Sequence, residues 1–418
     1  MTDRIAETLE KLSAFGRTAD GGVTRLPFTA ESEAAAQFLL QYFREAGFRA
    51  FRDATGAVHG ISEDPAGAAD LPRILIGSHY DSVVNGGRFD GVTGVVCAAE
   101  AVRAYREAGG RGLSPEVIAT NDEEGVRFSR GFLTSTAMCD GFSDRDFAEI
   151  VDLETGETLG QVLAAHGCDP EAVKAMKDSI SGYDAFLEVH IEQGPVLYKN
   201  GEQIGVVTGI NGIRRFLVTF RGEANHAGST PMNLRKDAFY MAAQVVQYVY
   251  DEALRTEGVV ATVGHAEIFP NAQNVIPCEV TFTIDMRSAD DGRMETLAEK
   301  IRRRALDAAE QAGGSVIFRQ TMQVPPVAMS GHFLQLLADA CAARQLSFCR
   351  MESGAGHDAE IFGRRIPAGM LFVPSIRGIS HNPAEESRIP DIAAAAEVLR
   401  TALVMYGDES AEKELQTQ

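Results

Sequence analysis

Histidines and carboxylates gather in five short stretches of the sequence. Taken singly, each has an ordinary structural explanation: His79 reads as a structural histidine more readily than as a ligand, and Asp90 suits a helix N-cap as well as a metal site. Together they supply nitrogen and oxygen ligands for two divalent ions bridged by one carboxylate. The stretches are 77–81 (GSHYD), 85–91 (NGGRFDG), 121–125 (NDEEG), 186–194 (FLEVHIEQG) and 379–385 (ISHNPAE).

The acidic run of Asp122, Glu123 and Glu124 begins three residues after the end of the short apolar run 117–119. Such runs are usually solvated loops, but at the end of a buried strand the carboxylates repel one another unless cations lie among them. Asp81, two residues after His79, can accept the second ring N–H of that histidine, as partners of metal-binding histidines commonly do. These stretches therefore predict a metal site that is surrounded by charged side chains.

The elements that must position these residues alternate between strands and helices. The apolar runs 74–76 and 117–119 predict buried strands, and 91–108 predicts the crossover helix between them. This βαβ order indicates a mostly parallel sheet, whose ligands bind at the carboxyl ends of the strands.

A different order begins near residue 212. The patterns predict strands at 214–221, 259–268, 279–287 and 315–319 and helices at 235–255 and 290–312. This is the βαββαβ order of a ferredoxin-like unit. Helix 332–343 and strand 370–373 then resume the first pattern. We therefore predict an α/β protein: a mostly parallel sheet catalytic domain, 1–211 and 326–418, with an inserted ferredoxin-like βαββαβ domain, 212–325.

The composition excludes some classes of binding partner. The 39 Lys and Arg residues against 59 Asp and Glu give a net charge of −20, the wrong sign for nucleic acid. The sequence has no apolar run near the roughly 18 residues that a membrane span needs, and its start lacks a signal-peptide pattern. The 6 cysteines are scattered without CxxC pairs, as reduced thiols are. We expect a cytoplasmic protein with no nucleic-acid or membrane partner, whose metals are held by histidines and carboxylates.

Six motifs resemble those of the M20-type dinuclear metallohydrolases, in the amidase branch that contains N-carbamoyl-L-amino acid hydrolases, allantoate amidohydrolases and ureidoglycolate amidohydrolases. The resemblance extends from about residue 70 to 390. Segments 212–216 and 354–359 resemble the allantoate enzymes more than the carbamoylases. The motifs are GSHYDSVVNGGRFDG, DEEGVRF, EVHIEQGP, NHAGSTPM, GHDA and GISHNPAE.

The resemblance implies two divalent ions, zinc or manganese, with cobalt or nickel as further options. It places His79, Asp90 and His190 on one ion, and Asp90, Glu124 and His381 on the other. Peptidase relatives carry an acid at the position of His190. Glu123 would be the general base, since a ligated carboxylate is engaged and its unligated neighbour can take a proton.

The resemblance also implies substrate contacts. Arg287 offers a fork for a carboxylate, although alone it would read as a surface salt bridge. His226 can polarise a ureido carbonyl and stabilise the oxyanion, as a second catalytic residue. The remaining contacts are Gln193, Asn274 and Gly356, with Arg214 as an added candidate.

Several implied contacts lie in the inserted domain, so we expect closure about a hinge near 209–212 and 325. The sequence departs from the family pattern at 133–135, where a Gly-Ser pair is usual, and at Ile213, where a glutamine is usual. The second departure bears on which ureido compound is preferred.

The functional prediction is metal-dependent hydrolysis of the terminal carbamoyl (ureido) amide of a small acid, with allantoate preferred and ammonia and carbon dioxide released. The alternatives are an N-carbamoyl-L-amino acid hydrolase, a more distant M20-type peptidase, and a binding protein without activity. Arg214 favours allantoate, whose two ureido arms need an added polar partner. We also expect a homodimer, with the inserted domain as lid and dimerisation domain.

Overall fold

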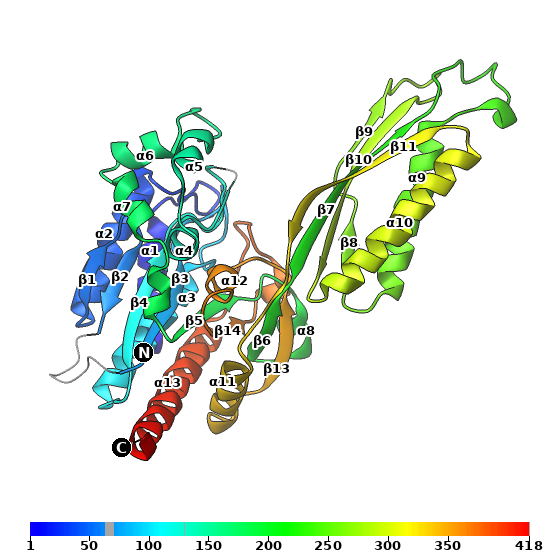
Figure 1. Ribbon diagram of the computed structural model, residues 1–418. Coiled ribbons are helices and arrows are strands. Elements are labelled where there is room, and N and C mark those ends of the chain that lie inside the picture. Colours follow the sequence, from blue (N-terminus) through cyan, green and yellow to red (C-terminus); the bar gives the residue numbers. More distant parts are fainter. Residues whose placement is uncertain (63–70, 129, 418) are drawn as a thin grey trace. The chain divides into compact units, whose positions relative to one another are not determined.

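The computed structural model describes residues 1–62, 71–128 and 130–417, with side chains to residue 412. The chain divides into two units (Figure 1). The first unit is Met1–Thr208 with Met329–Gln418, and the second unit is Gly209–Ala328.

The main sheet is parallel at its centre and antiparallel at its edges. Among the described residues its order is β1-β2-β4-β3-β5-β14-β6-β12, and β13 pairs with β6. The central strands β4, β3, β5 and β14 run parallel, as the βαβ pattern predicts. The strands are β1 Arg49–Arg52, β2 Val58–Ile61, β3 Arg73–His79, β4 Ser114–Thr120, β5 Ala185–Ile191, β6 Ile204–Ile210, β12 Val327–Ala328, β13 Phe348–Ser353 and β14 Ala368–Val373.

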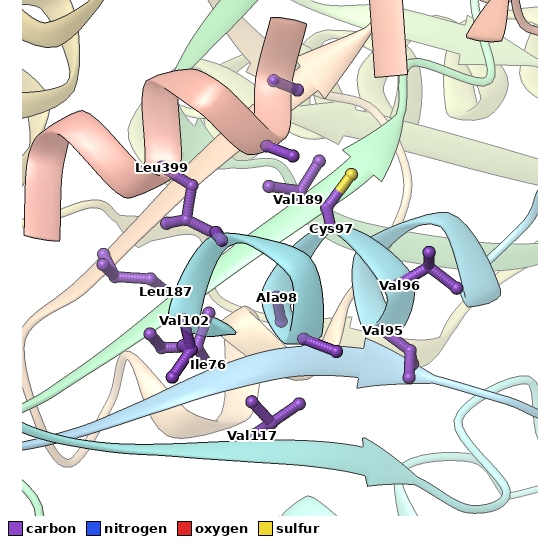
Figure 2. Packing of buried hydrophobic residues seen from close by; sticks show 14 of the residues in the cluster. Ile76, Val95, Val96, Cys97, Ala98, Val102, Val117, Leu187, Val189 and Leu399 are labelled. Atoms are coloured by element: carbon purple, nitrogen blue, oxygen red, sulfur yellow. The ribbon is translucent and has the colours of Figure 1, made fainter. Parts of the chain in front are cut away.

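The crossover helix α3, Val92–Glu107, confirms the prediction over 91–108 and lies inside the first unit. Its sequence, VTGVVCAAEAVRAYRE, is apolar on nearly every side because it packs between the sheet and another helix. Figure 2 shows Val95 and Val102 facing Ile76 and Val117 of the sheet, with Leu399 of α13 above. Burial on both sides holds the start of α3 beside the ends of β3 and β5.

The other helices of the first unit surround this centre. The longer ones are α1 Thr2–Ala14, α2 Ala30–Glu45, α11 Gly331–Ala343 and α13 Ile389–Thr417. The short ones are α4 Leu133–Cys139, α5 Asp144–Glu149, α6 Leu159–Ala165, α7 Pro170–Ala175, α8 Val196–Asn200 and α12 Asp358–Phe362. In the described part of the chain, no helix is long and apolar enough to cross a membrane.

The second unit is an antiparallel sheet, ordered β11-β7-β10-β8 with β9 on β10, and two helices cover one of its faces (Figure 1). Buried and half-buried residues alternate along β7 and β10, as expected for a sheet with one face packed. The elements are β7 Gly212–Arg221, α9 Ala238–Arg255, β8 Val260–Thr262, β9 Ala266–Phe269, β10 Glu279–Ser288, α10 Asp291–Gln311 and β11 Ser315–Val324.

The single strand predicted at 259–268 is wrong: the structure has two strands, β8 and β9, in its place. Thr262 pairs with Asp285 and Ala266 pairs with Phe282, so three residues on one side oppose two on the other. The extra residue interrupts the ladder as a bulge does. With β8 and β9 counted as one interrupted strand beside β10, the order of elements is the predicted βαββαβ pattern.

Candidate metal centre

Three buried side chains meet where the sheet's central strands end. His79 ends β3, His190 lies near the end of β5, and Asp90 precedes α3. Asp90 Oδ1 lies 3.2 Å from His190 Nε2 and 3.8 Å from His79 Nε2, and the two Nε2 atoms are 3.3 Å apart. Their spacing could hold one metal ion.

A second group shares Asp90. His381 Nε2 lies 3.2 Å from Asp90 Oδ2 and 3.6 Å from Glu124 Oε2. This group is more open, since the His381 side chain is 48% exposed. Asp90 thus turns one carboxylate oxygen to each group, the arrangement of a carboxylate that bridges two ions.

The chemistry of these atoms fits bound cations. Asp90 Oδ1 and Glu124 Oε1 are buried and accept no hydrogen bond from the described residues. Buried carboxylate oxygens without partners are costly unless a cation satisfies them. The five side chains therefore suit two divalent ions with nitrogen and oxygen ligands.

The histidine rings are oriented by backbone carbonyls. His79 Nδ1 donates to the Asp81 carbonyl at 3.1 Å, and His190 Nδ1 donates to the Ile191 carbonyl at 2.9 Å. A carbonyl can only accept, so the proton lies on Nδ1 and Nε2 keeps the lone pair that a metal needs. Both rings therefore turn Nε2, the nitrogen that can ligate a metal, toward Asp90.

Two contacts fix the loop that carries Asp90. Glu385 accepts the backbone N–H groups of Phe89 and Asp90 at 3.0 and 3.1 Å. Gly91 has a φ of +66°, and a Cβ there would lie 2.4 Å from the ring of His79. The NGGRFDG turn therefore needs glycine at 91 so that Asp90 and His79 can approach.

The acidic run after β4 is held by Asp81, whose carboxylate accepts the N–H groups of Glu123 and Glu124 at 3.1 and 3.2 Å. Burial, Asp90 and Asp81 raise the pKa of Glu124 to about 7, although His79 and His381 oppose the shift. Burial is also the main cause that raises the pKa of Glu123 well above its ordinary value, with Glu124 adding to it. Glu123 belongs to neither ligand group, so it is a buried acid placed beside the centre and suited to proton transfer.

Two further candidates lie in the first unit. Gln193 donates through Nε2 to Asp90 Oδ2 at 3.1 Å, and the same nitrogen lies 3.2 Å from His381 Nε2. Gly356 faces Phe132, because a Cβ at 356 would come 3.0 Å from its ring. Gln193 thus contacts the candidate metal ligands directly, whereas Gly356 lies against the ring of Phe132.

His226 and Asn274 come together in the second unit. Ala227 N–H donates to the Asn274 carbonyl at 3.0 Å, and His226 forms a β-bridge with Val275. His226 Nδ1 accepts the N–H groups of Gly228 and Ser229 at 3.0 and 3.2 Å. The proton of the neutral ring is therefore on Nε2, which can donate to an oxyanion.

The two candidate arginines lie on opposite faces of the second unit's sheet. Arg287 is on the face away from the helices, where its Nε donates to Asp285 Oδ1 at 3.0 Å. Arg214 is buried on the helix side, where it binds Asp291 at 2.8 Å and also Glu295. These contacts favour a structural role for Arg214.

Sequence reasoning assigned no role to Glu385 or to His357. The ring of His357 packs on His190 with centroids 4.4 Å apart, and its Nε2 lies 2.9 Å from Ser353 Oγ. Glu385 lies in the motif GISHNPAE and His357 in the motif GHDA, and membership of these motifs is the sequence feature that could have pointed to them. Glu188, His190 and His357 also have ligand-like spacing, but Ser78 O–H and Ala359 N–H already occupy Glu188. We therefore interpret Glu188 and His357 as residues that pack around His190 and hold it in place, and not as ligands of a further ion.

Comparisons with known proteins find matches over most of the chain. Residues 75–404 match Peptidase family M20/M25/M40. The chain is 39% identical to an N-carbamoyl-L-amino-acid amidohydrolase of Paenarthrobacter aurescens, covering 95% of this chain and 96% of that protein. It is 36% identical to an allantoate amidohydrolase of Escherichia coli (strain K12), covering 96% and 97%. A hydantoinase/carbamoylase family amidase from Burkholderia ambifaria has a similar structure, with a TM-score of 0.89, 34% identity and 97% of each chain covered.

Proposed function

We propose that this chain, which belongs to peptidase family M20/M25/M40, hydrolyses the terminal carbamoyl (ureido) amide of a small acid and releases ammonia and carbon dioxide. It is a metal-binding amidohydrolase by family and by ligand set. The observation that carries the proposal is Asp90, whose two carboxylate oxygens face two separate groups of ligands while the unligated Glu123 lies beside them.

His79, Asp90 and His190 would hold one ion, and Asp90, Glu124 and His381 the other. When bound, two divalent ions supply Lewis-acid polarisation and a water of lowered pKa. We favour zinc or manganese, and the same ligands would accept cobalt or nickel. Metal analysis of the purified protein tests this choice.

Three residues of the chain carry the remaining steps. Glu123 takes a proton from the attacking water and returns it to the leaving nitrogen, since it lies beside the two ligand groups without belonging to either. His226 donates from Nε2 to the developing oxyanion. Arg287 binds the carboxylate of the substrate, with Gln193, Asn274 and Gly356 as further contacts.

Allantoate is the first substrate to test, because segments 212–216 and 354–359 resemble the allantoate enzymes. N-carbamoyl-L-amino acids are the second candidate, since Arg214, the added partner expected for a second ureido arm, is held by Asp291 and Glu295 on the helix side. The test is ammonia release from allantoate, ureidoglycolate, N-carbamoyl amino acids and dipeptides, after chelation and with metal added back. Cleavage of dipeptides alone would overturn the proposal.

Arg287 supplies a kinetic test. A carboxylate clamp holds the ground state and the transition state alike, so Arg287→Leu should raise KM steeply and lower kcat less. A substrate with a carboxamide in place of the carboxylate should not respond to the substitution. A loss confined to kcat would contradict the assignment.

We further propose a homodimer joined through the second unit. Arg287 lies at one end of β10, while His226 and Asn274 lie beyond the other end, where Glu279 pairs with Arg221. Eight residues of strand separate the two ends by about 27 Å at about 3.4 Å per residue, too far for one small acid. A second copy of the chain can bring its own His226 and Asn274 to the first copy's substrate.

An apolar stripe on α9 offers the surface for this contact. Phe239, Val246, Tyr250 and Leu254 recur at helical spacing and are 49%, 37%, 65% and 72% exposed. The double variant Tyr250→Glu with Leu254→Lys should sediment as a monomer and lose activity. Leu153→Lys, an exposed change in the first unit, is the matched control. A double variant that stays dimeric would overturn this interface.

The six cysteines carry free thiols, which supports the expected cytoplasmic location. Fractionation of cells that produce the tagged full-length protein tests it.

A further inference from the structure

Three charged side chains form a cluster on the open face of the second unit's sheet. Asp285 of β10 accepts the Nε hydrogen of Arg215 through Oδ2 at 2.6 Å and that of Arg287 through Oδ1 at 3.0 Å. The two guanidinium groups therefore flank one carboxylate. Arg215 was not among the residues that the sequence patterns pointed to.

Strand alternation explains why the neighbouring arginines differ. Side chains of consecutive residues in β7 point to opposite faces, so Arg214 faces the helices while Arg215 shares a face with Asp285 and Arg287. Asp285 is the register partner of Arg215 across the two strands. Arg215 thus lies next to the candidate carboxylate clamp, and Arg214 does not.

The cluster keeps a positive charge. Burial would raise the pKa of Asp285, but hydrogen bonds from Arg215 and Arg287 hold it below its ordinary value. One carboxylate therefore neutralises only one of the two arginines. At the other end of the β7–β10 ladder, Arg221 pairs with Glu279 at 2.8 Å, one cation with one carboxylate. Among the described residues of the β7–β10 face, the Arg287 end thus carries two guanidinium groups around one carboxylate, whereas the Arg221 end carries one guanidinium group and one carboxylate.

Arg215 is also available for a ligand. It uses Nε on Asp285, and in the described part of the chain its two terminal amino groups make no other hydrogen bond. Its side chain is 43% exposed. A guanidinium oriented in this way presents a planar fork that matches a carboxylate.

We propose that Arg215 is a further substrate-binding residue that forms, with Arg287, a two-arginine clamp for the carboxylate of the substrate acid. Asp285 is the positioning residue that sets the plane of both guanidinium groups. This inference rests on the proposed function and deepens it by assigning a second residue to the recognition of the carboxylate.

The test compares two arginines of one strand. Arg215→Gln should raise KM for the best substrate acid about ten- to a hundred-fold with kcat little changed, as expected on losing a hydrogen bond to a charged group. Arg221→Gln is the matched control, since it removes an ion-paired arginine from the same strand and face. Its KM should stay unchanged. With the carboxamide analogue, the Arg215 variant should behave like the native protein.

Asp285→Asn tests the positioning role. It keeps both arginines but weakens their orientation, so KM should rise less than in Arg215→Gln. The double variant Asp285→Asn with Arg215→Gln should lose less substrate affinity than the sum of the losses in the two single variants. Arg215→Lys should recover part of the affinity because it restores charge without the fork.

The outcomes separate the two proposals. If the native protein hydrolyses a ureido or carbamoyl acid but Arg215→Gln and Arg221→Gln change KM alike, the clamp is overturned and the proposed function stands. Equal losses for the acid and its carboxamide would also overturn the clamp. If the native protein with added metal hydrolyses no member of the substrate panel, the proposed function fails and takes the clamp with it.

Discussion

The two units place their candidate functional residues in opposite settings. In the first unit His79, Asp90 and His190 are 2%, 4% and 1% exposed and are held by backbone contacts. In the second unit the side chains of Arg215 and Arg287 are 43% and 30% exposed on an open sheet face. The first unit is thus organised around buried charge, and the second around charge that a ligand can reach.

This difference separates two requirements of the proposed chemistry. Metal ligands must be held within a few tenths of an ångström, which needs a packed surround such as α3 and the central strands. Residues that recognise a substrate must meet it from solvent, so they lie on a surface. Substitutions of the buried ligands and Glu123 in the first unit should therefore change metal content or the chemical step, and those of Arg215 and Arg287 in the second should change affinity.

The largest effect should come from Asp90→Ala. Because this carboxylate faces both ligand groups, its loss should remove both ions and abolish activity. Metal counting on the purified protein measures this. His381→Ala is the control, since it touches only the more open group and should keep one ion per chain. Two ions retained by Asp90→Ala would contradict the shared-ligand assignment.

The adjacent acids Glu123 and Glu124 should separate within the first unit. Glu123→Gln should keep its metal content and substrate affinity and lower kcat by about 10² to 10⁴, the range of general acid-base catalysis. Glu124→Gln should lose metal from the second group and regain part of its activity with excess metal. Activity plotted against added metal measures both. A rescued Glu123→Gln would mean that the roles are reversed.

The first unit could be predicted further from sequence than the second. Polar stretches that follow buried parallel strands must meet at one sheet edge, so the grouping of His79, Asp90 and His190 follows from the order of elements. The alternation of β7 was readable too, but a one-residue change of register exchanges its two faces. Arg214 was favoured on another ground, the resemblance to the allantoate enzymes and the added polar partner that a second ureido arm needs.

Other features needed the folded chain. The interruption between β8 and β9 arises from one unmatched residue opposite β10, and no apolar pattern marks it. The contact of Glu385 with the loop of Asp90 joins residues almost 300 positions apart. The tautomer of His226 depends on two backbone N–H groups in a loop. Such contacts depend on tertiary geometry that local spacing does not encode.

Buried charge in the first unit extends beyond the metal centre and should make its stability depend on pH. His59 is 4% exposed and lies 2.7 Å from Glu116 and 3.1 Å from Asp53. Burial lowers its pKa, but the two carboxylates outweigh this and raise the pKa to about 9. Protonation of His59 is therefore more favourable in the folded protein than in the unfolded chain, where the pKa of the ring is about 6.5.

This stabilisation should be complete below pH 6.5 and lost as the pH rises through about 9. At about 1.4 kcal/mol per pKa unit, it amounts to roughly 3 kcal/mol of unfolding free energy. Urea unfolding followed by circular dichroism at pH 6 and pH 9.5 should show the decline in the native protein and a smaller one in His59→Gln. If the unfolding free energy falls equally in the two proteins between pH 6 and pH 9.5, His59 is excluded as the cause.

The smallest effect concerns Arg214, the one candidate of the second unit that is buried. Its side chain is 6% exposed and binds Asp291 and Glu295, whose own side chains are 36% and 64% exposed. Since water still reaches both carboxylates, Arg214→Leu should lower the unfolding free energy by only about 1 kcal/mol, with KM unchanged. Arg215→Leu, one residue away on the other face, should show the reverse: a raised KM and little loss of stability. If instead Arg214→Leu raises KM while stability is kept, then the buried arginine reaches the substrate, and the division between a structural and a ligand-facing side of this sheet is wrong.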